Sequence, residues 1–178
     1  LHAMGYNGTG QLGIGNTTNK TSPTQVVASG VVQVAAGANH SLFVKSDGSL
    51  HAMGQNDKGQ LGNGNTTHQN YAVQITTEVV QVATGVSHSL YLKSDGSLWA
   101  MGDNDYGMLG NGNTTDQNSP VQIVASGVVQ VATGASHSLF LKTAGSLWAM
   151  GANDNGQLGD GTADANPHST PIRIVASG

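Results

Sequence analysis

Residues 98–102, with the sequence LWAMG, recur in nearly the same form three more times along the chain. The related segments are LHAMG at residues 1–5, LHAMG at 50–54 and LWAMG at 147–151. Their starts at residues 1, 50, 98 and 147 define a repeat of about 49 residues. A fixed period of this length indicates a chain built from stacked copies of one supersecondary unit.

The composition favours short strands joined by tight turns. The 178 residues include 26 Gly, only 9% are charged, and the 37% hydrophobic content argues against disorder. With a net charge of −4 and six Lys and Arg in total, no basic patch is expected and nucleic acid binding is disfavoured. The absence of Cys excludes disulfides, and no apolar run approaches the length of a membrane span. The chain begins at Leu1 without a signal peptide pattern, so we expect it to be processed or cut from something longer.

Four strands are predicted in each complete unit. In the first such unit they cover residues 31–35, 41–45, 50–53 and 72–75. Asp47-Gly48 marks a hairpin between two of them, because both residues accept a positive φ. The fourth strand recurs at residues 121–124 and 172–175. Four short strands in a unit of this length are typical of one blade of an all-β propeller. The predicted blades cover residues 31–77, 78–127 and 128–178, and residues 1–30 form the outer half of another blade.

The resulting prediction is a β-propeller arc of about 3.5 four-stranded blades. Each blade covers its faces with its two neighbours, so an open arc presents apolar ends that usually mark association sites. Either a second copy completes a ring, or the chain is part of a longer repeat protein. Two copies would bring identical outer half-blades, which do not complete one another. This favours the alternative in which the chain is part of a longer repeat protein.

Two motifs resemble those of a known family. Residues 54–64 read Gly-x-x-x-x-Gly-Gln-Leu-Gly-x-Gly, and residues 79–90 read Val-x-x-Val-x-x-Gly-x-x-His-Ser-Leu. The combination is similar to the regulator of chromosome condensation repeat and recurs along the whole chain. The resemblance implies a propeller, usually seven-bladed, whose members serve nucleotide exchange on a small GTPase, β-lactamase inhibition, light sensing or adaptor roles. Fold therefore does not fix function, and no active-site residue is carried over.

Three histidines occupy the same position in successive units: His40, His88 and His137. Three imidazoles are able to ligate Zn²⁺, but equivalent positions of a propeller lie far apart unless they point into a narrow channel. The favoured interpretation is a buried histidine that joins adjacent strands or blades through its ring N–H, with a metal site as the weak alternative.

The segment Asp103–Gly107 resembles the opening of a calcium loop but lacks the bidentate Glu that follows in such loops. Tight turns require the same Asn, Asp and Gly residues, and this is the favoured interpretation. No Ser, His and acid are arranged in a way that suggests a triad. We therefore predict no catalytic residue, no cofactor and no enzymatic activity.

Positions that differ between the units identify candidate partner-binding residues. Four lie in the turn after Met-Gly and one after the Thr-rich stretch: Tyr6, Lys58, Tyr106 and Asn155, and Tyr71. Loops on a rigid scaffold often carry binding, and Tyr is favoured at interfaces. The sequence thus predicts a protein-interaction or surface-structural module, with Tyr6 and Tyr106 on one contact rim.

Two other functions stay open from the sequence. One is an inhibitor that fills an enzyme cleft, as the β-lactamase-inhibiting relatives do, and the other is a unit whose open faces assemble into a ring or fibre. The expected partner is accordingly a protein or another copy of the chain. Low charge with abundant Thr, Asn and Gly resembles secreted bacterial repeat proteins and predicts an extracellular or cell-surface location. Asn-x-Thr tripeptides, such as the one at Asn65, leave N-glycosylation open.

Overall fold

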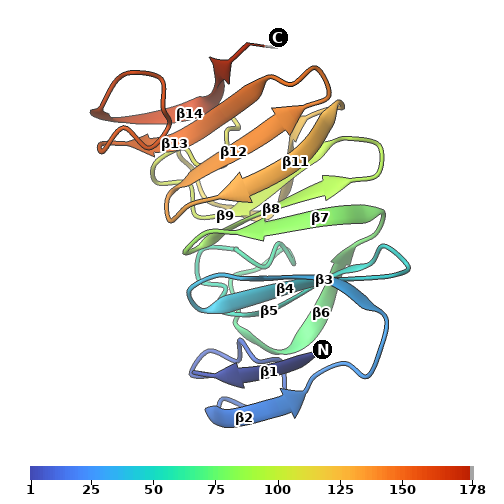
Figure 1. Cartoon of the computed structure of the whole chain (residues 1–178). Coiled ribbons are helices and arrows are strands. Elements are labelled where there is room, and N and C mark those ends of the chain that lie inside the picture. The colour runs from blue at the N-terminus through green and yellow to red at the C-terminus, as the bar shows by residue number, and fades with distance from the viewer. Residues whose placement is uncertain (177–178) are drawn as a thin grey trace.

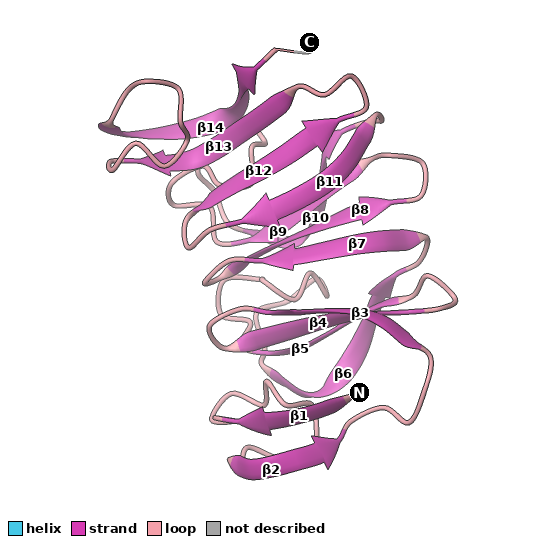
Figure 2. Cartoon of the chain, in the orientation of Figure 1, coloured by secondary structure: helices cyan, strands magenta, loops and turns pink. Residues whose placement is uncertain are grey.

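The computed structural model describes residues 1–176, and all regular secondary structure in this range is β-strand (Figure 2). In these residues we find no helix with the length and apolarity needed to cross a membrane. The strands are β1 (His2–Gly5), β2 (Lys20–Gln25), β3 (Val31–Ala36), β4 (His40–Lys45), β5 (Leu50–Gly54), β6 (Gln69–Thr76), β7 (Val79–Thr84), β8 (His88–Lys93), β9 (Leu98–Gly102), β10 (Gln117–Val124), β11 (Val128–Thr133), β12 (His137–Lys142), β13 (Leu147–Asn153) and β14 (Asp164–Val175).

The strands form one two-stranded sheet and three four-stranded sheets. β1 pairs with β2, and the larger sheets are antiparallel meanders in chain order: β3 to β6, β7 to β10 and β11 to β14. Figure 1 shows the sheets stacked one after another from the N-terminal to the C-terminal end. The first strands of neighbouring four-stranded sheets contact one another, so they line the inner side of the stack. The predicted all-β propeller arc is confirmed.

The hairpin between β4 and β5 has the predicted position. Gly48 has a φ of 78°, whereas Asp47 is not in the left-handed region. The Asp47 Oδ1 instead accepts hydrogen bonds from the backbone N–H and the hydroxyl of Ser49, at 2.9 and 2.6 Å. The predicted hairpin is therefore present; the Asp side chain closes the turn, and only Gly48 adopts the positive φ that both residue types accept.

The hydrophobic core lies between the sheets. One cluster joins the first two four-stranded sheets and includes Leu42, Leu50 and Met101; the other joins the second and third and includes Leu98 and Phe140. Each strand alternates side chains between two faces, so the sheet from β7 to β10 contributes to both clusters. Burial of apolar area between neighbouring sheets is consequently what holds one unit to the next.

Candidate functional site

A buried asparagine organises each loop that follows the Met-Gly strand. In the loop after β9, Asn104 Nδ2 donates to the carbonyl oxygens of Asn113 and Thr115, at 2.9 and 3.2 Å. The Oδ1 atom of Asn104 accepts from the Leu109 N–H at 3.0 Å. Equivalent buried side chains make contacts of the same kinds in the other loops: Asn7, Asn56 and Asn153. Because each amide is bonded to its own loop, the loop is rigid while neighbouring residues are free to differ.

Lys58 joins two neighbouring loops through an ion-pair cluster. Its Nζ lies 3.1 Å from Asp105 Oδ2, 3.1 Å from Asp116 Oδ2 and 3.7 Å from Asp103 Oδ1. Lys58 follows β5 and the three carboxylates follow β9, so the contact crosses from one sheet to the next. Hydrogen bonds to Asp116 and Asp105 raise the pKa of Lys58. The loop after β9 thus presents an acidic socket that is filled by an ammonium group.

The acidic socket has its own electrostatic balance. Burial raises the pKa of Asp103, and this effect is opposed by the Asp105 backbone N–H and by the charge of Lys58. Asp116 Oδ1 also accepts from the Asn104 backbone N–H at 2.8 Å, which fixes the carboxylate in place. The buried asparagine and the ion-pair cluster are therefore parts of one loop structure.

Tyr106 stands at the same repeat position as Lys58, and it is 49% exposed. It borders two cavities where the loop after β9 meets the loop after β13. The larger, of about 340 Å³, is also lined by His137, Asp154 and Asn155. The smaller, of about 220 Å³, is also lined by Asp154 and Asp164. Two of the predicted partner-binding residues, Tyr106 and Asn155, are thus brought together at one cavity.

The other two tyrosine candidates lie on different loops or strands. Tyr6 is 61% exposed in the loop after β1, where its ring lies over Gly8. Tyr71 is 64% exposed on β6, is paired with Ile14 and lies over Gly15. Tyr6 therefore shares its loop type with Tyr106, whereas Tyr71 lies where the two-stranded sheet meets the next sheet. Figure 1 places the loops after β1 and β13 on the same side of the arc, at the left of the view.

The repeated histidines connect one sheet to the next. His40 Nε2 lies 3.0 Å from Ser89 Oγ, and His88 Nε2 lies 3.0 Å from Ser138 Oγ. Ser89 donates its hydroxyl proton to the Gln60 carbonyl oxygen at 2.8 Å, so it accepts a hydrogen bond from the imidazole N–H. Burial lowers the pKa of His40 to about 4 and, with the nearby histidines, that of His88 to about 3. The rings are therefore neutral at neutral pH and have the joining role favoured by the sequence.

The histidines are not brought together as a set of metal ligands. Among residues 1–176, only Asp103, Asp105 and Asp116 form a group of three or more potential ligands within 4.8 Å of one another. The serine–histidine pairs also differ from a nucleophile and its base, because each serine proton is held by a carbonyl oxygen. The Nδ1 atoms of His40 and His88 are buried without a partner, so no carboxylate orients either ring.

A second connection between sheets was missed from the sequence. Gln33 Oε1 accepts from the Val82 N–H at 3.1 Å, and Gln81 bonds to both backbone groups of Val131, at 3.1 and 3.3 Å. The signal was present, because Gln occupies the third position of Val-Val-Gln-Val in every complete unit. A polar residue that is invariant on an inner strand indicates a backbone contact with the neighbouring unit.

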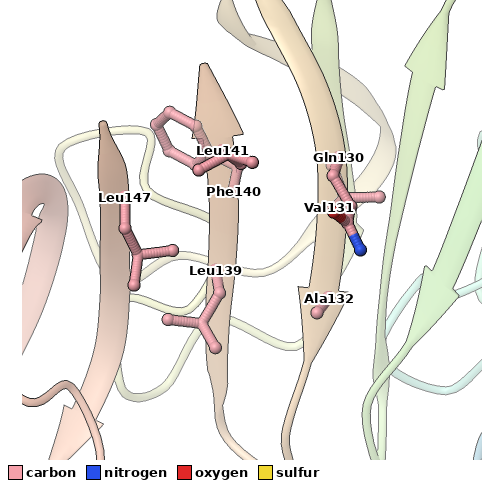
Figure 3. Close-up of a pocket in the computed structure, with 7 residues that line it drawn as sticks. All are labelled: Gln130, Val131, Ala132, Leu139, Phe140, Leu141 and Leu147. Carbon is pink, nitrogen blue, oxygen red and sulfur yellow. The ribbon is translucent and has the colours of Figure 1, made fainter. Parts of the chain in front are cut away.

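The last sheet exposes positions that are buried in the other sheets. Leu139 on β12 is partly exposed, whereas the equivalent Leu42 and Leu90 are at most 1% exposed. An open cavity of about 200 Å³ lies at this end face. Figure 3 shows the side chains from β11, β12 and β13 that line it: Gln130, Val131, Ala132, Leu139, Phe140, Leu141 and Leu147. At the opposite end, a cavity of about 330 Å³ lies between β1 and the sheet that begins with β3.

Stacked four-stranded meanders, joined sheet to sheet by apolar clusters and by repeated His and Gln contacts, define a β-propeller protein. The family model of the regulator of chromosome condensation (RCC1) repeat matches residues 1–44, 47–92, 95–141 and 144–178. A second model of this repeat matches residues 31–60, 79–107 and 128–157. The chain belongs to the RCC1 repeat family, as its motifs predicted.

Solved structures of propellers are similar to the chain over nearly its whole length. Human WBSCR16 is 27% identical with a TM-score of 0.81, and the match covers 97% of this chain and 46% of that one. Prp20p from Saccharomyces cerevisiae is 22% identical with a TM-score of 0.85, covering 99% of this chain and 46% of that one. Yeast RCC1 (Prp20) bound to Kap60 matches with a TM-score of 0.84. The chain spans about half the length of these proteins.

Proposed function

We propose that this chain is a non-enzymatic protein-interaction module that binds its partner through the loops after β1, β5, β9 and β13. The observation that carries the proposal is the exposed Tyr106 beside a cavity, on a loop fixed by the buried Asn104. An aromatic side chain held on a rigid loop loses little conformational entropy when it is buried by a partner. Tyr6 presents a second exposed ring from the equivalent loop of the first unit.

The similar structures support protein partners for a surface of this kind. Prp20p is described by its binding to Gsp1p and histones, and yeast RCC1 by its complex with Kap60. An identity of 22% is a likeness of fold, so we transfer none of these partners to this chain. The non-enzymatic part of the proposal is supported by the burial of the serine and histidine pairs, which places their hydroxyl groups out of reach of a substrate.

The test is a quantitative comparison of the proteins retained by three forms of the immobilised chain. The forms are the wild type, the double variant Tyr6→Ala with Tyr106→Ala, and the variant Tyr71→Ala. The last removes the remaining candidate ring, which lies on β6 outside the proposed loops and is at least as exposed as the other two. A partner retained by the wild type and Tyr71→Ala should be retained about tenfold less by the double variant, because exposed aromatic anchors carry much of the binding energy at interfaces.

The variants should keep their fold, since substitutions of exposed residues usually change stability by less than about 0.5 kcal/mol. Far-UV circular dichroism and a urea titration check this. Equal retention by the wild type and the double variant would remove these loops as the contact surface.

Self-association through the end sheets is a second candidate function. It is favoured by the partial exposure of Leu139 at a position that is buried in both preceding sheets. An equivalent sheet from another copy of the chain is the partner that would cover this face.

A further inference from the structure

The Lys58 cluster shows how this scaffold holds an ammonium group between two units. The ammonium comes from the loop after β5, and its carboxylate acceptors come from the loop after β9. Lys58 immediately precedes an invariant Gly, and Asp105 immediately follows a buried Asn. These two positions are therefore identifiable in every unit.

The next junction keeps the acceptor and lacks the ammonium. Tyr106 occupies the position of Lys58, Asp154 occupies that of Asp105, and Ala152 occupies that of Asp103. The cavity of about 220 Å³ lies among these three side chains, and Asp164 also lines it. Ala152 has a methyl group where the preceding junction has the Asp103 carboxylate, so space remains here that Asp103 and Lys58 fill at that junction.

The cavity is negatively charged and has an aromatic wall. Asp154 accepts a hydrogen bond from Gln157 Nε2 at 2.9 Å and forms no salt bridge with a Lys or Arg among residues 1–176. Asp164 stays ionised because the Asn166 backbone N–H and the His168 ring hold its pKa below the usual value. A carboxylate beside the face or edge of a tyrosine ring is a combination that recognises organic cations.

We propose that the cavity of about 220 Å³ beside Tyr106 binds a primary ammonium group, supplied as a lysine side chain by the protein partner. This inference rests on the proposed function only for the source of the lysine; the socket itself is defined by Tyr106, Asp154 and Asp164. The partner's lysine takes the place that Lys58 fills from within the chain at the preceding junction. A divalent metal is a poorer occupant, because the trio of carboxylates that would ligate it occurs at the Lys58 junction and is already paired with the Lys58 ammonium there.

The experiment titrates the full chain with Nα-acetyl-lysine methylamide and, in parallel, with the norleucine analogue, which has a similar aliphatic side chain without the ammonium. Backbone amide NMR shifts report binding at each loop. The lysine probe should produce saturable shifts at Tyr106, Asp154 and Asp164 with a dissociation constant on the order of tens of millimolar, because an ion pair and a cation–π contact near the surface are each weak. The norleucine probe should produce none, and Asp154→Asn should weaken lysine binding about tenfold.

Lys58→Met supplies an internal positive control, because it empties the preceding socket without altering the Tyr106 cavity. In this variant the lysine probe should produce an additional set of shifts at Asp103, Asp105 and Asp116. Absence of saturable shifts at Tyr106 and Asp154 in the wild type overturns the inference, and so do equal shifts with the norleucine probe. If the probe binds while the tyrosine double variant retains its partner, the ammonium site stands and the proposed partner surface fails.

Discussion

Glu78 carries backbone strain that the other units avoid. It is the one non-Gly residue with a positive φ among residues 1–176, at 66°, and the equivalent residues are Gly30 and Gly127. We expect Glu78→Gly to raise the free energy of unfolding by about 1 kcal/mol. The substitution removes the strain of an L-residue in the left-handed region, and this stabilises the folded chain by more than the added flexibility of Gly stabilises the unfolded chain. Urea denaturation measures the change.

The control for this substitution is Glu78→Ala. It removes the exposed pair with Lys93, at 3.5 Å, but keeps a Cβ atom in the left-handed conformation. Its stability should therefore stay within about 0.5 kcal/mol of the wild type. A Gly variant that is no more stable than the Ala variant contradicts the assignment of strain.

The buried histidines predict a loss of stability in mild acid. Burial lowers the pKa of His40 to about 4 and that of His88 to about 3, from an ordinary value of 6.5. The unfolded chain therefore binds more protons than the folded chain below about pH 6.5. The stabilising contribution is fully present above this pH and is lost as the pH falls toward 4 and 3, at a slope approaching about 1.4 kcal/mol per pH unit for each histidine.

Urea titrations between pH 7 and pH 5 test this prediction, because most carboxylates remain ionised in that window. His88→Gln, which keeps a side-chain N–H donor and cannot be protonated, should be less stable at pH 7 and should show a shallower decline toward pH 5. A wild-type curve that declines no more steeply than that of the variant would show that His88 does not gain a proton on unfolding.

The element that sets the spacing between sheets is the innermost strand. Gln81 on β7 bonds to both backbone groups of Val131 on β11, whereas Gln130 occupies the same position on the end sheet and has no such contact within residues 1–176. We expect Gln81→Met to lower the free energy of unfolding by about 1 to 3 kcal/mol, because a buried N–H and C=O lose their partners. Gln130→Met, the matched variant, should change it by less than about 0.5 kcal/mol. Equal effects in a thermal or urea titration contradict a role in joining the sheets.

The repeat predicted the inner strands of each sheet well and the outer strand less well. β6 was predicted at residues 72–75 and extends over Gln69–Thr76, because its added polar residues are held by backbone pairing with Gly54 and carry no hydrophobic pattern. At the candidate site, Tyr106 and Asn155 were identified from their variability between units. That they line one cavity depends on the angle between neighbouring sheets, which the residue pattern does not contain.

At the scale of the whole molecule, the two end faces differ from the internal junctions. If the second candidate function holds, sedimentation should show a mass that rises with protein concentration. Leu139→Glu should weaken this association at least tenfold, or about 1.4 kcal/mol, because it places a charge in the face that is covered. Thr114→Glu, on an exposed loop, is the matched charge control. A strict monomer at high concentration contradicts self-association through these faces.

The histidine contact has a consequence for how such chains change length. His40 meets Ser89 and His88 meets Ser138, so every contact of this kind spans only consecutive units. Excision of residues 79–127 would bring Ser138 opposite His40 with the same donor and acceptor, and duplication of the same segment would insert a further compatible pair. Gain or loss of a whole unit in the gene therefore preserves the His–Ser contact between the units that become neighbours. Each unit also keeps its own loop residues for partner binding.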